Sequence, residues 1–223
     1  SHFPRRHQTR DRAPTDRLTP RISTMRNKLL NTLILIAATA LSTSASAHLG
    51  TDSGTHHTLV DGLLHPLTGL DHLAAMLAVG LWSALSATSA RRIWLAPVAF
   101  AGMLLVGALL GLNGLALPAV EPMIAASLLV MGLLVATRAK LPLAVTAGVV
   151  GVFAVFHGIA HGTELAGGGN GFAPLLGMLV ATIALHLAGV GLGLALRSHS
   201  VWWPRVVGGL TALLGGAFLL HLV

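Results

Sequence analysis

Residues 142–163 have the sequence PLAVTAGVVGVFAVFHGIAHGT, an apolar run with no Asp, Glu, Lys or Arg. A helix of about 20 apolar residues crosses the hydrocarbon core of a bilayer, so this run has the length and composition of a transmembrane helix. Two histidines, His157 and His161, nevertheless interrupt it. Because ionisable side chains are costly in hydrocarbon, those found there usually serve a function. The run therefore predicts a membrane protein with a polar site inside the bilayer.

Outward from this run, five more segments have a similar length and composition. They cover residues 62–86, 93–112, 119–137, 172–196 and 202–222. In the whole chain, 54% of the residues are hydrophobic and 9% are charged, whereas a soluble domain carries about 25% charged residues. We therefore predict an all-α integral membrane protein, in which a bundle of about six transmembrane helices occupies residues 62–223.

The chain ahead of the predicted bundle divides into three parts. Residues 1–24 are polar and rich in Arg and Pro, which predicts a disordered extension ahead of a true start at Met25. Residues 25–47 have the basic start, apolar middle and small-residue end of a cleavable signal peptide. Residues 48–61 then form a periplasmic segment that begins with His48. An uncleaved first transmembrane helix is the alternative to the signal peptide.

The distribution of charge predicts an orientation. The formal net charge is +7, but eight of the 14 basic residues and two of the seven acidic ones precede Ala47, so +6 lies in the leader. Basic charge is thus not gathered on a folded surface, which argues against a nucleic-acid partner. The remaining basic residues fall in alternate connections, which the positive-inside rule makes cytoplasmic; they are Arg91, Arg92, Arg138, Lys140, Arg197 and Arg205. We expect a multi-pass protein of the bacterial inner membrane with a periplasmic mature N-terminus.

Two short motifs bring imidazole and carboxylate side chains into the apolar segments. Residues 65–72 have the sequence HPLTGLDH, and residues 156–164 have the sequence FHGIAHGTE. On a helix, each motif places most of its ionisable side chains along one stripe. Imidazole and carboxylate ligands without a thiol suit nickel, cobalt or zinc. The predicted metal-binding residues are His65, Asp71, His72, His157, His161 and Glu164, with Met76, His186 and His48 as secondary candidates.

The rise of an α-helix, about 1.5 Å per residue, gives these ligands an order across the bilayer. The predicted order from the outer mouth to the midplane is Glu164 and His161, then His65 and His157, then Asp71 and His72. His186, halfway along its segment, extends the row inward. A graded row of ligands suits the passage of an ion better than one closed cage does. Asp71 is either a direct ligand or a partner that orients an imidazole.

Both motifs resemble those of a known family. The pattern HPxxGxDHxxxMxxVGxW that starts at His65 and the pattern FHGxAHGxE that starts at Phe156 are similar to those of the HupE/UreJ family of nickel/cobalt permeases. The resemblance covers residues 48–223 and the signal peptide. It implies uptake of Ni²⁺, or of Co²⁺, across the inner membrane to supply the maturation of hydrogenase or urease. It also implies that the ion is a transported substrate, with no prosthetic group and no enzymatic activity.

Two other functions remain open on the residues alone. An intramembrane metal-dependent hydrolase would also hold a metal with His and Asp, although the sequence has no HExxH motif and its ionisable groups are spread along a path. A metal sensor or a structural partner of a metalloenzyme assembly is the third interpretation. The oligomeric state, a homo-oligomer included, is not determined by the sequence. Glu121 and His221 lie at segment ends, where a helix-terminal or interfacial role is the simpler interpretation.

Glycines predict close packing between the helices. Gly107-xxx-Gly111 and Gly189-xxx-Gly193 have the spacing at which small residues let two helix backbones approach in lipid. The last segment adds the pairs 208–209 and 215–216. We expect this segment to be a structural scaffold.

Overall fold

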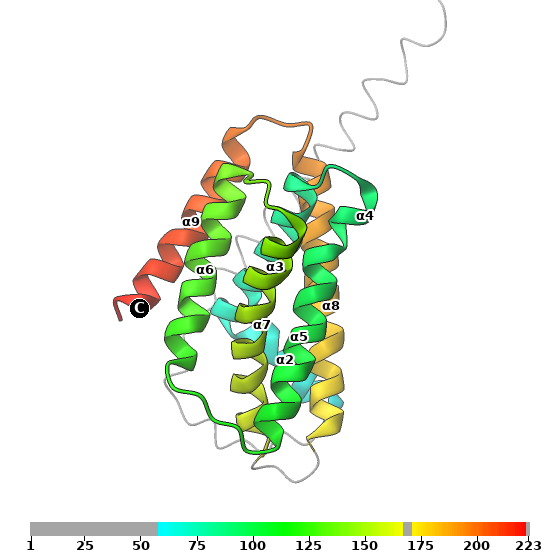
Figure 1. Ribbon diagram of the computed structural model, residues 1–223, viewed down its shortest axis with the longest axis vertical. Helices are drawn as coiled ribbons and strands as arrows, with labels where there is room; N and C mark the ends of the chain where they lie inside the picture. The colour runs from blue at the N-terminus through cyan, green and yellow to red at the C-terminus, as the bar shows by residue number, and fades with distance from the viewer. Residues whose placement is uncertain (1–57, 167–170, 222–223) are drawn as a thin grey trace, which may run out of the picture. The chain divides into compact units, whose positions relative to one another are not determined.

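Helices and short connections make up the part of the chain that the computed structural model describes, residues 58–166 and 171–221. The chain divides into two units, residues 1–43 and 44–223, and all described residues belong to the second. The helices, labelled as in Figure 1, are α2 (Leu59–Thr68), α3 (Leu70–Ser86), α4 (Ala90–Ile93), α5 (Leu95–Leu112), α6 (Val120–Thr137), α7 (Leu143–Ala166), α8 (Phe172–Leu196) and α9 (Trp202–Leu219). The predicted all-α class is confirmed. The predicted extension, signal peptide and His48 lie outside the described residues.

Within the described ranges, four helical segments are long and apolar enough to cross a membrane. They are Ala90–Leu112, Val120–Thr137, Leu143–Ala166 and Phe172–Leu196, and the bent pair α2–α3 makes a fifth if it counts as one span. Five of the six predicted segments, all but the first, match single observed helices to within a few residues. The predicted count of six is not confirmed, because α9 is not among the candidate spans. Its first turn, Trp-Trp-Pro-Arg, is less apolar than the rest of the helix.

The sequence predicts one continuous helix over residues 62–86, but this segment forms two helices. It breaks at Gly69, and α2 and α3 meet at an angle of 83°. Pro66 in α2 has no N–H to donate to the preceding turn. Gly69 then takes an extended conformation, with φ −84° and ψ 112°, so that it ends α2 and begins α3. The two half-helices therefore point in different directions.

Glycines join the helices in close pairs, as the sequence predicts. A Cβ atom on Gly107 of α5 would meet the backbone of α7, one on Gly189 of α8 would meet that of α3, and one on Gly208 of α9 would meet that of α6. By contrast, a Cβ atom on Gly209 or Gly216 would have no described atom within 4 Å. Three close pairs, α5–α7, α3–α8 and α6–α9, thus form the frame of the bundle.

The connections that carry basic residues lie at the same end of the bundle. Figure 1 shows the α3–α5, α6–α7 and α8–α9 connections together at the top. Two hydrogen bonds hold this end of the bundle together. Trp82 Nε1 of α3 donates to Ala139 O in the α6–α7 connection at 2.9 Å, and the Arg197 guanidinium at the end of α8 donates to Ala87 O in the α3–α5 connection. The α5–α6 connection and the end of α7 lie at the opposite end, which bears Glu164.

Candidate metal centre

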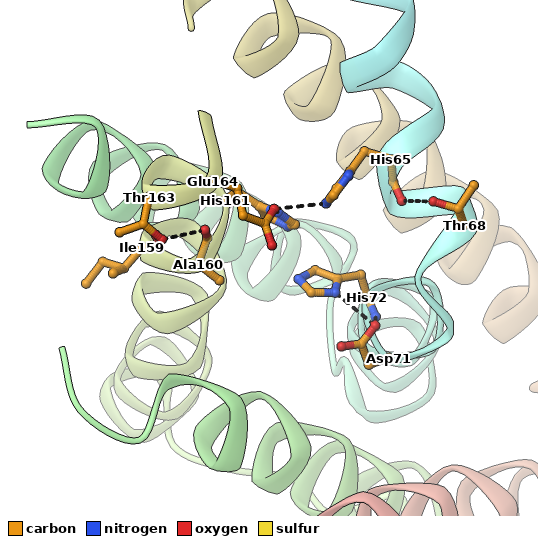
Figure 2. Close-up of polar contacts among 9 residues, drawn as sticks. All are labelled: His65, Thr68, Asp71, His72, Ile159, Ala160, His161, Thr163 and Glu164. Atoms are coloured by element: carbon orange, nitrogen blue, oxygen red, sulfur yellow. Dashed lines mark hydrogen bonds and ion pairs between the residues drawn. The ribbon is translucent and has the colours of Figure 1, made fainter. Parts of the chain in front are cut away.

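Two helices bring three of the predicted ligands together. His65 lies near the end of α2, and His161 and Glu164 lie one turn apart near the end of α7. Glu164 Oε2 is 3.4 Å from His65 Nε2 and 3.6 Å from His161 Nδ1 (Figure 2). One ligand atom from each side chain lies within 4.8 Å of those of the other two. This spacing is compatible with three ligands of a single metal ion.

The imidazole rings continue from this trio as a row. The ring centroids of His65 and His161 are 4.9 Å apart, those of His161 and His72 are 4.3 Å apart, and those of His72 and His157 are 4.8 Å apart. His157 and His161 have no exposed surface, whereas the Glu164 side chain is 41% exposed. The row therefore runs from an exposed carboxylate into the interior of the bundle.

The order of the rings differs from the predicted order. The sequence predicts His65 and His157 at a common depth, with His72 below them. Instead, His65 lies against His161, and His72 lies between His161 and His157. The physical reason is the bend at Gly69, because a constant rise per residue cannot be counted across two helices that meet at 83°.

Asp71 acts on the imidazole beside it. Its Oδ1 is 3.0 Å from His72 Nδ1 and also accepts from the His72 backbone N–H at 2.8 Å. A carboxylate oxygen accepts the Nδ1 proton, so that the lone pair of the neutral ring is at Nε2. An outer partner of this kind is typical of metal-ligating histidines. The geometry therefore favours the orienting role for Asp71.

At its buried end the row reaches Phe100 of α5. The centroid of this ring is 5.5 Å from that of His157 and 5.2 Å from that of His186 in α8. His186 Nδ1 donates to Thr182 O at 2.7 Å, and its Nε2 is buried without a hydrogen-bond partner among the described residues. His186 thus adjoins the row through Phe100. Met76 is fully buried in α3.

Sequence reasoning missed both Phe100 and a second contact, from Ser127 of α6. The Ser127 hydroxyl oxygen is 3.0 Å from His157 Nε2. Nothing distinguishes Phe100 from the other apolar residues of its segment. Ser127, however, is the one hydroxyl residue between the ends of the apolar segment 119–137, and that isolation was a usable signal.

A cavity of about 380 Å³ leads to the row from one side. Helices α3, α6, α7 and α9 contribute to its walls, and its polar lining residues are Asp71, His72, Glu121, Thr163, Glu164 and His221. Three of these six are carboxylates, and a cleft lined by one sign of charge concentrates ions of the other sign. Glu121 and His221 both line this cavity. A helix-terminal or interfacial role, as inferred from the sequence, is therefore not their whole role.

The fold and the site define a class of protein, namely a multi-pass membrane protein with a row of histidines in its bundle and the Glu164 carboxylate at the exposed end of that row. The chain belongs to the HupE/UreJ protein family, a transporter-type family, which it matches over residues 36–218. It is similar to Protein HupE of Rhizobium leguminosarum bv. viciae, with 43% identity over 186 residues that cover 82% of this chain and 94% of the relative. No solved structure matches the chain.

Proposed function

We propose that the protein is a permease for the uptake of nickel ions, or of cobalt ions, across the bacterial inner membrane. The observation that carries the proposal is the row of four imidazoles that begins at the exposed Glu164 carboxylate and ends at the buried His157. Neutral imidazoles suit late divalent transition metals. Neighbouring rings 4.3–4.9 Å apart offer successive ligands, so an ion can be passed on without returning to water.

The orientation follows from the charges at the two ends of the bundle. By the positive-inside rule, the end with the basic connections is cytoplasmic. The carboxylate-lined cavity then opens to the periplasm, the side on which we place the mature N-terminus. A divalent cation that moves inward gains about 4–5 kcal/mol from a 100 mV inside-negative potential. This gain supports facilitated uptake that needs no counter-ion.

Membership of the HupE/UreJ family supports the nature of the substrate. The metal ion is then the transported cargo, the protein holds no prosthetic group, and it is not an enzyme. We propose that the imported metal supplies the maturation of hydrogenase or urease. In this role the protein acts on a small ion and the lipid bilayer, and a nucleic-acid partner has no part in it.

The direct test is metal flux into liposomes that contain only this protein. With an inside-negative potential, we expect Ni²⁺ or Co²⁺ to reach an enclosed fluorescent chelator, whereas Ca²⁺ does not. Protein-free liposomes under the same potential are the control. Absence of Ni²⁺ and Co²⁺ flux from protein that is folded and inserted would refute the permease. Metal-dependent peptide cleavage without flux would favour the intramembrane hydrolase instead.

Asp71→Asn tests whether the Asp71 charge strengthens His72 as a metal ligand. The amide oxygen can still accept from His72 Nδ1, but the negative charge that strengthens the imidazole as a ligand is lost. Changes to such outer partners typically cost about 10- to 100-fold in metal affinity or activity. We expect a loss of this size in the initial rate of Ni²⁺ uptake. An unchanged rate would mean that the Asp71 charge has no role in transport.

A further inference from the structure

Ser127 lies midway along α6, and its hydroxyl group has two polar neighbours. The Ser127 Oγ is 2.6 Å from Ile124 O, one turn back in the same helix, and 3.0 Å from His157 Nε2 in α7. Both side chains are buried, since Ser127 is 1% exposed and His157 is not exposed at all. Water therefore does not compete for these contacts, and the hydrogen-bonding capacity of each group decides the arrangement.

The direction of both hydrogen bonds follows from that capacity. A hydroxyl group has one hydrogen to donate, and a carbonyl oxygen can only accept. The shorter contact, with Ile124 O, therefore uses the Ser127 hydrogen. The hydroxyl oxygen is left as an acceptor, so His157 Nε2 is the donor. A neutral imidazole with its proton on Nε2 carries its lone pair on Nδ1.

We infer that Ser127 is a positioning residue that holds His157 in the tautomer whose Nδ1 lone pair is available to the transported ion. His157 Nδ1 is buried and has no hydrogen-bond partner among the described residues. The His157 ring is also the last of the row, between His72 and Phe100. The inference deepens the proposed function, and its role in transport rests on that function.

Two other histidines also have one ring nitrogen held by a hydrogen-bond acceptor, which supports this inference. Asp71 Oδ1 accepts from His72 Nδ1, and Thr182 O accepts from His186 Nδ1. Both acceptors bind the proton on Nδ1, so the lone pair of each neutral ring is at Nε2. Ser127 instead holds Nε2 of His157. The nitrogen left with a lone pair for the ion is therefore Nε2 in His72, Nδ1 in His157 and Nε2 in His186.

The first test measures the tautomer itself and needs no transport. Solid-state NMR of the full chain in lipid, metal-free and labelled with ¹⁵N-histidine, separates the two tautomers by their ring nitrogen shifts. The signal of His157 is identified by its loss in His157→Asn. We expect the proton on Nε2 in the wild type and a mixture of tautomers in Ser127→Ala. A wild-type proton on Nδ1, or a tautomer unchanged in Ser127→Ala, would overturn the inference.

The second test measures Ni²⁺ uptake by proteoliposomes. We expect Ser127→Ala to lower the initial rate about 10- to 100-fold, the usual cost of losing an outer partner of a metal-binding histidine. Ser127→Thr keeps a hydroxyl group and should restore most of the rate. The matched control is Ser83→Ala, because the Ser83 hydroxyl is also buried but donates to Ile93 O in another part of the bundle.

The outcomes separate this inference from the proposed function. A Ser127→Ala protein that transports at the wild-type rate, or a Ser127→Thr protein as slow as Ser127→Ala, would overturn the positioning role. A Ser83→Ala protein as slow as Ser127→Ala would do so as well, because loss of any buried hydroxyl would then suffice. If the wild type carries no metal, the proposed function fails, and the NMR measurement alone decides whether Ser127 sets the His157 tautomer.

Discussion

Replacing His161 with alanine is expected to reduce nickel accumulation to the level of cells without the protein. The His161 ring is the junction of the row, in contact with both His65 and His72, and its Nδ1 is 3.6 Å from Glu164 Oε2. Its loss removes one ligand of the outer trio and opens a gap before His72. Loss of an outer partner already costs about 10- to 100-fold. For a direct ligand we therefore expect a loss of more than about 100-fold in the initial uptake rate.

The measurement is ⁶³Ni accumulation in whole cells, normalised to the amount of protein in the membrane fraction. A second variant, His161→Asn, fills the volume of the ring more closely than alanine does. It should lose uptake as well, which separates the loss of a ligand from a loss of folding. His199→Ala is the matched control, because His199 lies in the basic α8–α9 connection, where its ring contacts Ala195 O at 2.9 Å. Wild-type uptake by the His161→Ala protein would refute the proposed path.

Gly158→Ala is expected to destabilise the bundle strongly, although it adds one methyl group. A Cβ atom at Gly158 of α7 would lie 2.7 Å from Ala108 N and 2.9 Å from Gly107 Cα, and it would also collide with Leu104 O. All three atoms belong to the backbone of α5 and cannot rotate away. Overpacking of a core typically costs about 1–3 kcal/mol, and we expect at least this loss in the free energy of unfolding.

Gly148→Ala in the same helix is the control, and it is expected to cause no loss of stability. A Cβ atom at Gly148 meets no described atom within 4 Å. Alanine is favoured over glycine within a helix by about 0.5–1 kcal/mol, so this variant should be as stable as the wild type or slightly more stable. Unfolding of the purified proteins in detergent, followed by circular dichroism, measures both. Equal stability of the two variants would contradict the close approach of α5 and α7.

Most of the fold could be predicted from the sequence because the bilayer constrains length and composition strongly. Segment 172–196 coincides with α8, and segment 119–137 differs from α6 by one residue at its start. The bend at Gly69 could not be predicted, because Pro66 alone is tolerated in many membrane helices. What makes it a break is the extended conformation of Gly69. The α2 helix that ends there packs closely against α8, where a Cβ atom on Gly62 would meet the backbone of Pro174.

The candidate site was predictable in its residue types but not in its order. Imidazole and carboxylate groups are conspicuous in apolar segments, so the histidines of the row and Glu164 could be found. Their sequence of contacts depends on the directions of three helices, and the bend changed one of these directions. Phe100 is an ordinary residue for a membrane helix, and only its contact with His157 gives it a role. Ser127 stands out as a lone hydroxyl residue between the ends of its segment, but the sequence does not show that its partner is His157.

The bend at Gly69 also has an electrostatic consequence. Peptide dipoles along a continuous helix cancel except at its ends, so an unbroken helix would leave no net partial charge at Gly69. Here α2 ends and α3 begins at Gly69. The end of α2 therefore carries a partial negative charge beside His65. The start of α3 carries a partial positive charge beside Asp71. The first favours a cation at His65, and the second stabilises the buried Asp71 carboxylate. The backbone thus adds a field to the site that no side chain supplies.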